Sequence, residues 1–122
     1  MEILEKHGIK KKKIAILGLT FKEDTDDIRD SPALSIIKEL MMEDAELILF
    51  DPMAMARIRK LFPHLRYAKT SQEAVNAADI VLLLTEWEEF KKLNYGNKQV
   101  IDGKNIFYGT AKKPMNYEGI CW

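Results

Sequence analysis

Three cations are the side chains of this chain best suited to hold an anionic ligand. Lys22 and Arg29 lie in a polar loop, residues 20–30, and Lys104 lies in a short turn of sequence Asp-Gly-Lys-Asn. An ammonium offers a point charge to an anion, whereas a guanidinium can make two parallel hydrogen bonds to a phosphate. Binding of a phosphate-bearing ligand therefore has to be considered at these two places.

The loop of residues 20–30 is also dense in acidic side chains, which would repel a phosphate if all of them faced it. These acids are Glu23, Asp24, Asp26, Asp27 and Asp30. They would be equally suited to the positive end of a following helix. The only glycine nearby is Gly18, so the loop lacks the G-x-G-x-x-G pattern of an ordinary dinucleotide site. Composition alone favours a solvated loop here, and Lys104 could equally be a solvated turn residue.

Metal and thiol chemistry have little support in the sequence. His7 and His64 have no partners at the spacing of metal ligands, so no metal site is expected. Cys121 has no neighbouring residues that would activate its thiol. The sequence therefore offers no candidate residue for metal or thiol catalysis.

Three further side chains follow predicted strands. Asp51 stands where many dinucleotide-binding folds carry a ribose-binding acid, but its distance from Gly18 is too long for that pattern, so a helix cap is favoured. Trp87 and Phe90 follow a strongly apolar run, where core packing is favoured and stacking on a base stays open.

The elements around the acidic loop indicate where it lies. Residues 14–19 form an apolar run typical of a strand buried on both faces. Ser31 and Pro32 then suit the cap and first position of a helix that we expect to end near Glu43. A strand that leads into a helix places the loop between them at the carboxyl end of a sheet, where open α/β folds bind ligands.

Strands and helices alternate along the rest of the chain. We expect strands at 45–50, 65–68, 80–84, 98–101, 105–108 and 116–122, and helices at 1–7, 52–61 and 70–78. Thr70-Ser-Gln-Glu73 and Thr85-Glu-Trp-Glu88 each match the capping box that starts a helix, and the second predicts a short helix. This alternation predicts a Rossmann-like three-layer α/β/α sandwich with a mostly parallel sheet.

Composition limits the classes of function. The 122 residues suit one domain, and 19 basic against 19 acidic side chains give no electrostatic case for nucleic acid or an anionic membrane. No apolar run is long enough to span a membrane, and a single cysteine fits a cytoplasmic protein.

The first loop also carries a family resemblance. The stretch Gly18-Leu-Thr-Phe-Lys-Glu-Asp-Thr-Asp-Asp-Ile-Arg-Asp-Ser-Pro-Ala-Leu34 resembles the motif that opens the C-terminal domain of the UDP-glucose/GDP-mannose dehydrogenase family. Three later segments resemble the same domain in the same order: Phe50-Asp-Pro52, Thr85-Glu-Trp-Glu-Glu-Phe90 and Val100-Ile-Asp-Gly-Lys-Asn105. Within the family, the likeness is greatest to the members that oxidise UDP-glucose.

The resemblance reverses the preference for a solvated loop. It implies that Phe21 and Lys22 contact a UDP-sugar and that Arg29 reaches an NAD molecule bound by another domain. The position of Lys104 is usually arginine in the family and contacts the sugar nucleotide. Lysine keeps the positive charge at this position but cannot make the bidentate hydrogen bonds of an arginine.

The resemblance further implies a parent enzyme, with residues 11–122 as its UDP-sugar-binding C-terminal domain and residues 1–10 as the end of a preceding linker helix. Its N-terminal NAD-binding domain and central domain, with the catalytic cysteine, would lie upstream, and the parent would be a homodimer. It would use NAD to oxidise the sugar C6 alcohol twice, to a carboxylate. Two alternatives stay open: a family member acting on UDP-N-acetylmannosamine or GDP-mannose, and a non-catalytic α/β module.

Overall fold

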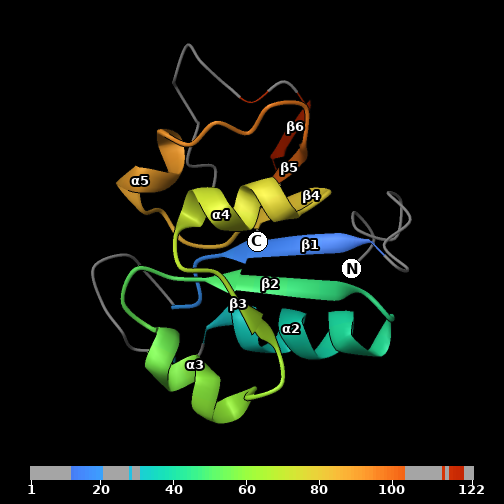
Figure 1. Ribbon diagram of the computed structural model, residues 1–122, viewed down its shortest axis with the longest axis vertical. Helices are drawn as coiled ribbons and strands as arrows, with labels where there is room; N and C mark the ends of the chain where they lie inside the picture. The colour runs from blue at the N-terminus through green and yellow to red at the C-terminus, as the bar shows by residue number, and fades with distance from the viewer. Residues whose placement is uncertain (1–11, 21–27, 29–30, 104–113, 115, 120–122) are drawn as a thin grey trace.

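One six-stranded sheet, in which all neighbouring strands are parallel, organises the described part of the chain. The computed structural model describes residues 12–20, 28, 31–103, 114 and 116–119. The strands lie in the order β3-β2-β1-β4-β5-β6. Their bounds are β1 Lys13–Leu17, β2 Glu46–Phe50, β3 Arg66–Tyr67, β4 Ile80–Leu83, β5 Gln99–Asp102 and β6 Asn116–Gly119. Figure 1 shows β1, in blue, at the middle of the sheet.

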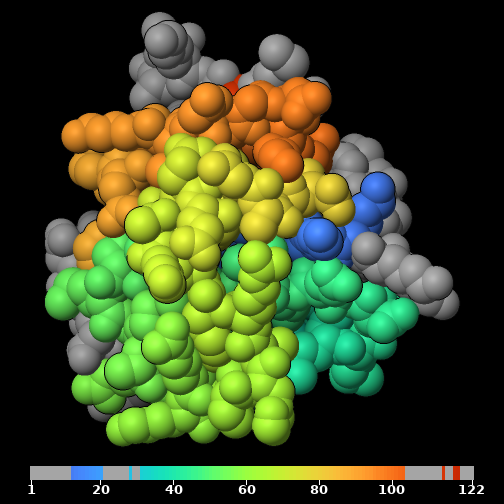
Figure 2. Space-filling view, in the orientation of Figure 1, coloured from blue at the N-terminus to red at the C-terminus, as the bar shows by residue number. Residues whose placement is uncertain are grey.

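Four described helices connect the strands. They are α2 Pro32–Met42, α3 Met55–Leu61, α4 Ser71–Ala77 and α5 Glu88–Lys91. In the space-filling view, α4 in yellow-green lies on the face towards the viewer, between α3 in green and α5 in orange (Figure 2).

The two faces of the sheet carry separate hydrophobic cores, as strand alternation requires. Ile14 and Ile16 of β1 pack on one face with residues of α2 and α3. Ala15 and Leu17 pack on the other face with residues of α4 and with Phe90 of α5. Side chains on both faces of β1 are fully buried from Ile14 to Leu17, which explains its continuous apolar run. The predicted three-layer sandwich is therefore confirmed.

Two helix starts follow the sequence signals. The Ser31 side chain accepts a hydrogen bond from the Ala33 N–H at 3.2 Å, and Pro32 occupies the first helical position of α2. The Thr70 hydroxyl accepts from the Glu73 N–H at 3.0 Å and caps α4. Both predicted caps are confirmed.

Two other predicted helix starts were wrong in part. The segment 52–54 forms a turn, so α3 begins at Met55 rather than Pro52. The capping box at Thr85-Glu-Trp-Glu88 does not form, because α5 is preceded by Trp87 without a side-chain cap. The Thr85 hydroxyl is used in a long-range contact instead.

The last two described strands, β5 and β6, are parallel neighbours. The turn predicted at Asp-Gly-Lys-Asn continues beyond the described residues. The predicted edge strand is confirmed over Asn116–Gly119. The predicted strand at 105–108, the predicted helix at 1–7 and the proposed boundary near residue 10 lie outside the described residues.

Candidate functional site

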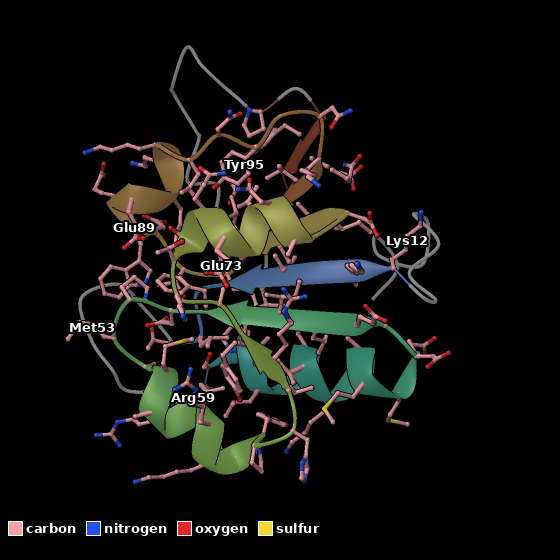
Figure 3. All side chains as sticks on the ribbon, in the orientation of Figure 1. Lys12, Met53, Arg59, Glu73, Glu89 and Tyr95 are labelled. Carbon is pink, nitrogen blue, oxygen red and sulfur yellow. The ribbon has the colours of Figure 1, made fainter. Side chains whose placement is uncertain are left out.

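The candidate site lies at the carboxyl edge of the sheet, where β1, β4 and β5 end side by side. The chain turns from β1 towards β2 on one side, whereas β4 lies on the other side, so this is the point at which the strand order reverses. Figure 3 labels Met53 and Glu89, which follow β2 and β4, on one side of the molecule and Lys12, which precedes β1, on the other. Ligand-binding loops of an open parallel sheet are expected on the side of Met53 and Glu89.

Gly18 and Thr85 fill the gap between β1 and β4 at this edge. Gly18 has a φ of +95°, and a Cβ there would lie 2.5 Å from Oγ1 and 2.6 Å from Cβ of Thr85. The gap that a glycine-rich loop leaves open for a pyrophosphate is therefore occupied by a threonine side chain. A phosphate cannot approach Gly18 in the manner of an ordinary dinucleotide fold.

The chain that leaves β1 is held from both sides. The Leu19 N–H donates to Asp51 Oδ2 at 2.7 Å, on the β2 side. The Thr85 hydroxyl donates to the Thr20 carbonyl at 3.0 Å, on the β4 side. Leu19, Thr20 and Thr85 are fully buried. The start of the acidic loop therefore has a fixed position.

Asp51 is a structural acid in this fold. Besides Leu19, its carboxylate accepts from the N–H groups of Met53 at 2.8 Å and Ala54 at 2.9 Å, and the residue is 1% exposed. These bonds hold the turn that precedes α3. Asp51 does not cap α3, because the N-cap residue of that helix is Ala54 and it has no side-chain cap, so the prediction of a helix cap was wrong. A buried carboxylate with three backbone donors also has no surface to offer a ribose.

A buried polar cluster lies at the end of β5. The Tyr117 hydroxyl donates to Asp102 Oδ2 at 2.7 Å, and the Tyr95 hydroxyl donates to the Phe90 carbonyl. Burial, the bond to Asp102 and the Asp102 charge together raise the pKa of Tyr117 well above its usual value. Burial, with a smaller contribution from Asp102, also raises the pKa of Tyr95. Both phenols stay protonated at neutral pH and act as donors.

Trp87 and Phe90 belong to the core on the α4 face. Phe90 is fully buried, and Trp87 is half-buried against the same cluster. The Trp87 Nε1 atom is buried and has no hydrogen-bond partner among the residues that the structure describes. Core packing is confirmed for both.

Phe21, Lys22, Arg29 and Lys104 lie outside the described residues, so their roles stay predictions. The last described residues before them, Thr20 and Gly103, both lie at the carboxyl edge of the sheet. Thr20 follows β1, and Gly103 follows β5, where its N–H donates to the Leu83 carbonyl of β4 at 2.8 Å. One strand separates β1 from β5, a spacing of about 10 Å. The two segments therefore start close enough to serve one ligand of nucleotide size.

Sequence reasoning missed the parts of the site that depend on pairing between distant elements. These are the bond from Thr85 to Thr20, which spans 65 residues, and the bond from Tyr117 to Asp102. No local pattern signals either of them. In the described ranges, no helix is long and apolar enough to cross a membrane, and no group of three or more His, Cys, Asp or Glu is placed to hold a metal.

Comparison with known proteins identifies the family. Residues 15–109 match the model of the UDP-glucose/GDP-mannose dehydrogenase family, UDP binding domain. The chain belongs to this dehydrogenase family. The matched residues run from strand β1 to beyond strand β5.

Curated relatives and solved structures agree with this assignment. The chain is 37% identical over 118 residues to the UDP-glucose 6-dehydrogenase of Rickettsia conorii, covering 89% of this chain and 27% of that protein. It is 36% identical over 121 residues to the UDP-glucose 6-dehydrogenase of Haloferax volcanii, covering 95% of this chain and 28% of the relative.

Among solved structures, a UDP-glucose dehydrogenase from Pyrobaculum islandicum superimposes with a TM-score of 0.90 at 30% identity, covering 99% of this chain and 28% of that one. A GDP-mannose dehydrogenase from Pseudomonas aeruginosa gives a TM-score of 0.76 at 27% identity, covering 98% and 30%. The chain thus spans between a quarter and a third of the length of these four proteins.

Proposed function

We propose that this domain binds UDP-glucose as part of a UDP-glucose 6-dehydrogenase. The observation that carries the proposal is the family match over residues 15–109, together with relatives at 36–37% identity that bear this name. In the proposed complex, Phe21, Lys22 and Lys104 contact the sugar nucleotide from the loops after β1 and β5.

The geometry of the described residues supports a ligand held by loops above the sheet. The gap between β1 and β4 is filled by Thr85, and Asp51 is fully engaged by backbone donors. In an ordinary dinucleotide fold, the glycine turn after the first strand and the acid after the second strand hold the ligand. Here neither of these two positions can contact a dinucleotide. A cation on each flanking loop would instead hold the diphosphate from both sides.

NAD takes a different place in the proposed enzyme. The cofactor would be bound by an N-terminal domain, and Arg29 would reach it across the domain boundary as a guanidinium fork on a phosphate. The nucleophile would be a cysteine of the central domain. The parent enzyme would be a cytoplasmic homodimer, and this chain alone would bind substrate without oxidising it.

Isothermal titration calorimetry of the chain with UDP, UDP-glucose and GDP-mannose tests the proposal. Saturable binding of UDP and UDP-glucose, with GDP-mannose weaker, is the expected result. A preference for GDP-mannose would favour the second candidate, to which the structural similarity to a GDP-mannose dehydrogenase points. No heat from any of the three would favour a non-catalytic α/β module.

A UDP-N-acetylmannosamine dehydrogenase is the third candidate. A solved structure of such an enzyme from Pyrococcus horikoshii superimposes on this chain with a TM-score of 0.67 at 28% identity. Turnover of the full-length parent with each of the three sugar nucleotides separates the candidates. Binding of UDP alone cannot do so, because UDP lacks the sugar on which the candidates differ.

A further inference from the structure

Helices α2 and α3 end in two small exposed surfaces of opposite charge. The acidic end, Met42-Glu-Asp44, closes α2, and the basic end, Arg59-Lys-Leu61, closes α3. Each end carries two like charges beside one large apolar side chain. These apolar side chains, Met42 and Leu61, are 86% and 54% exposed. Exposed apolar groups of this size are commonly covered in protein contacts.

The two ends lie side by side on one face of the sheet. α2 leads from β1 to β2 and α3 leads from β2 to β3, so both helices run from the carboxyl edge of the sheet to the amino edge. Both pack on the core that contains Ile14 and Ile16, and Figure 1 shows them on the same side of the sheet. Neighbouring packed helices have axes about 10 Å apart. The two ends are therefore close together, at the edge opposite the candidate site.

The acidic end is unfavourable for the domain by itself. A helix C-terminus carries partial negative charge, so Glu43 and Asp44 stand where carboxylates are least favourable, and the last turn of α2 has no basic side chain. Asp44 also has a φ of +62°, a conformation that a residue with a Cβ adopts at a cost. Neither carboxylate makes a hydrogen bond or ion pair within the part of the chain that the structure describes. Cations of a partner molecule would offset these costs.

The basic end has the complementary chemistry. The Arg59 guanidinium lies 5.0 Å from the ring centre of Tyr67, and the Tyr67 hydroxyl donates to the Phe62 carbonyl at 2.7 Å. Stacking restrains the guanidinium and leaves its N–H groups directed from the rim, where they can donate to carboxylates. Figure 3 labels Arg59 on α3. Lys60 adds a second charge and makes no ion pair with any other residue in the described ranges.

We propose that the α2–α3 face binds a second copy of this chain through a twofold contact, in which the basic end of each copy meets the acidic end of the other. A twofold interface uses the same surface on both copies, so that surface has to be complementary to itself. Two neighbouring patches of opposite charge meet this condition, because a twofold axis between them places each patch opposite its complement. The contact also covers Met42 and Leu61. It is independent of nucleotide binding, since it lies at the other edge of the sheet.

The contact should be weak and sensitive to salt, because exposed ion pairs contribute little and are screened. Sedimentation velocity of the chain over a range of concentrations measures it. A monomer–dimer equilibrium is expected, with a dissociation constant that rises about tenfold between about 50 mM and about 500 mM salt. A chain that stays monomeric in low salt up to its highest soluble concentration would overturn the inference.

Two variants with reversed charge test which surfaces pair. Glu43→Lys with Asp44→Asn makes the acidic end positive, and asparagine tolerates the left-handed φ. Arg59→Gln with Lys60→Glu makes the basic end negative. Neither variant should dimerise alone, because like charges would meet at both contacts. An equimolar mixture should form heterodimers, because opposite charges then meet at both contacts.

Glu86→Lys and Lys92→Glu are the matched controls. Both positions are exposed and flank α5, which packs on the other face of the sheet, so these variants should dimerise as wild type does. If a reversed variant does not fold, Glu43→Gln and Lys60→Gln each remove one charge with little change of shape. Each should weaken association about 2- to 5-fold.

The mixture gives the decisive result, since heterodimers also show that both reversed variants are folded. Dimerisation of either reversed variant alone would contradict the pairing of the two ends. A mixture of folded variants that stays monomeric, or an equal loss of association in the controls, would do the same.

Discussion

The Tyr117 hydroxyl on β6 donates a 2.7 Å hydrogen bond to Oδ2 of Asp102, the last residue of β5. Asp102 is fully buried, and the next residue but one is Lys104. The bond joins the edge strand of the sheet to the strand that leads into one half of the proposed site. Tyr117 thus ties the edge strand to the carboxyl end of β5.

Removal of this phenol should destabilise the domain at neutral pH. Tyr117→Phe leaves the buried Asp102 carboxylate with one donor fewer, which should cost about 1–3 kcal/mol of unfolding free energy. Because the pKa of Tyr117 is raised in the folded state, the folded chain keeps a proton that the unfolded chain releases near pH 10. The contribution is full below about pH 10 and falls as pH rises towards the folded pKa.

Urea unfolding of wild type and Tyr117→Phe from pH 7 to pH 11 measures this effect. The stability difference between the two should shrink above about pH 10. A constant stability difference from about pH 7 to about pH 11 would show that the protonation of Tyr117 is not linked to folding.

Asp102→Asn should lower the pKa of both Tyr117 and Tyr95, because the Asp102 charge helps to raise each of them.

Gly18→Ala should be among the most damaging single substitutions in the chain. The new Cβ would meet Thr85 at 2.5 Å while the backbone keeps a φ of +95°. Strain and collision together should cost about 3–5 kcal/mol, measured by denaturant unfolding. Gly96→Ala is the control: its φ is +55° with nothing within 4 Å of a Cβ, so only about 1–2 kcal/mol is expected. Similar losses at the two glycines would remove close packing as the reason for Gly18.

The two helix caps should act independently. Ser31→Ala and Thr70→Ala each remove a side-chain acceptor at a helix start, which typically costs about 1 kcal/mol. Their helices pack on opposite faces of the sheet, so the double variant should lose the sum to within about 0.5 kcal/mol. Thermal or urea unfolding of the three variants checks this. A double loss well below the sum would mean that the two helix starts are coupled, and no loss in one single variant would mean that its cap does not form in solution.

The fold could be predicted because its signals are local. Strand β1 has a continuous apolar run, and α2 and α4 begin at residues whose side chains cap them. The signal at Thr85 was equally clear but misleading, because a buried carbonyl 65 residues away competed for its hydroxyl. An unpaired buried carbonyl costs more than an uncapped solvent-facing helix end, so the distant partner prevailed.

The candidate site was predicted in a different way. Composition favoured a solvated loop, and only the family resemblance assigned Phe21, Lys22 and Lys104 to a ligand. Charge repulsion among the five loop acids is a real physical term, but it cannot be evaluated without the directions of the side chains. The contacts that Asp51 and Thr85 make to Leu19 and Thr20 depend on strand order, which no single segment encodes.

The two cations of the first loop should have separable roles. Lys22→Ala should weaken UDP-glucose binding by about 1.5–3 kcal/mol if the contact is desolvated, whereas Arg29→Ala should have little effect in the isolated domain. The reason is that Arg29 is proposed to act on NAD, which another domain would bind. Calorimetric titration of both variants tests the assignment, and equal losses would mean that the roles are wrong. In the full-length parent, Arg29→Ala should instead raise KM for NAD.

Lys104 decides whether the loop after β5 takes part in binding. If its ammonium faces the diphosphate, Lys104→Ala should lose about 1 kcal/mol of UDP-glucose affinity, a modest figure because water screens a charge in an open site. Lys104→Arg should keep or improve affinity, since a guanidinium can make two parallel hydrogen bonds where an ammonium offers one point charge. The loss in Lys104→Ala should also shrink at high salt. Equal dissociation constants for wild type and Lys104→Ala at low salt would make Lys104 a solvated turn residue, and Phe21 and Lys22 would then be the only proposed substrate contacts of this domain.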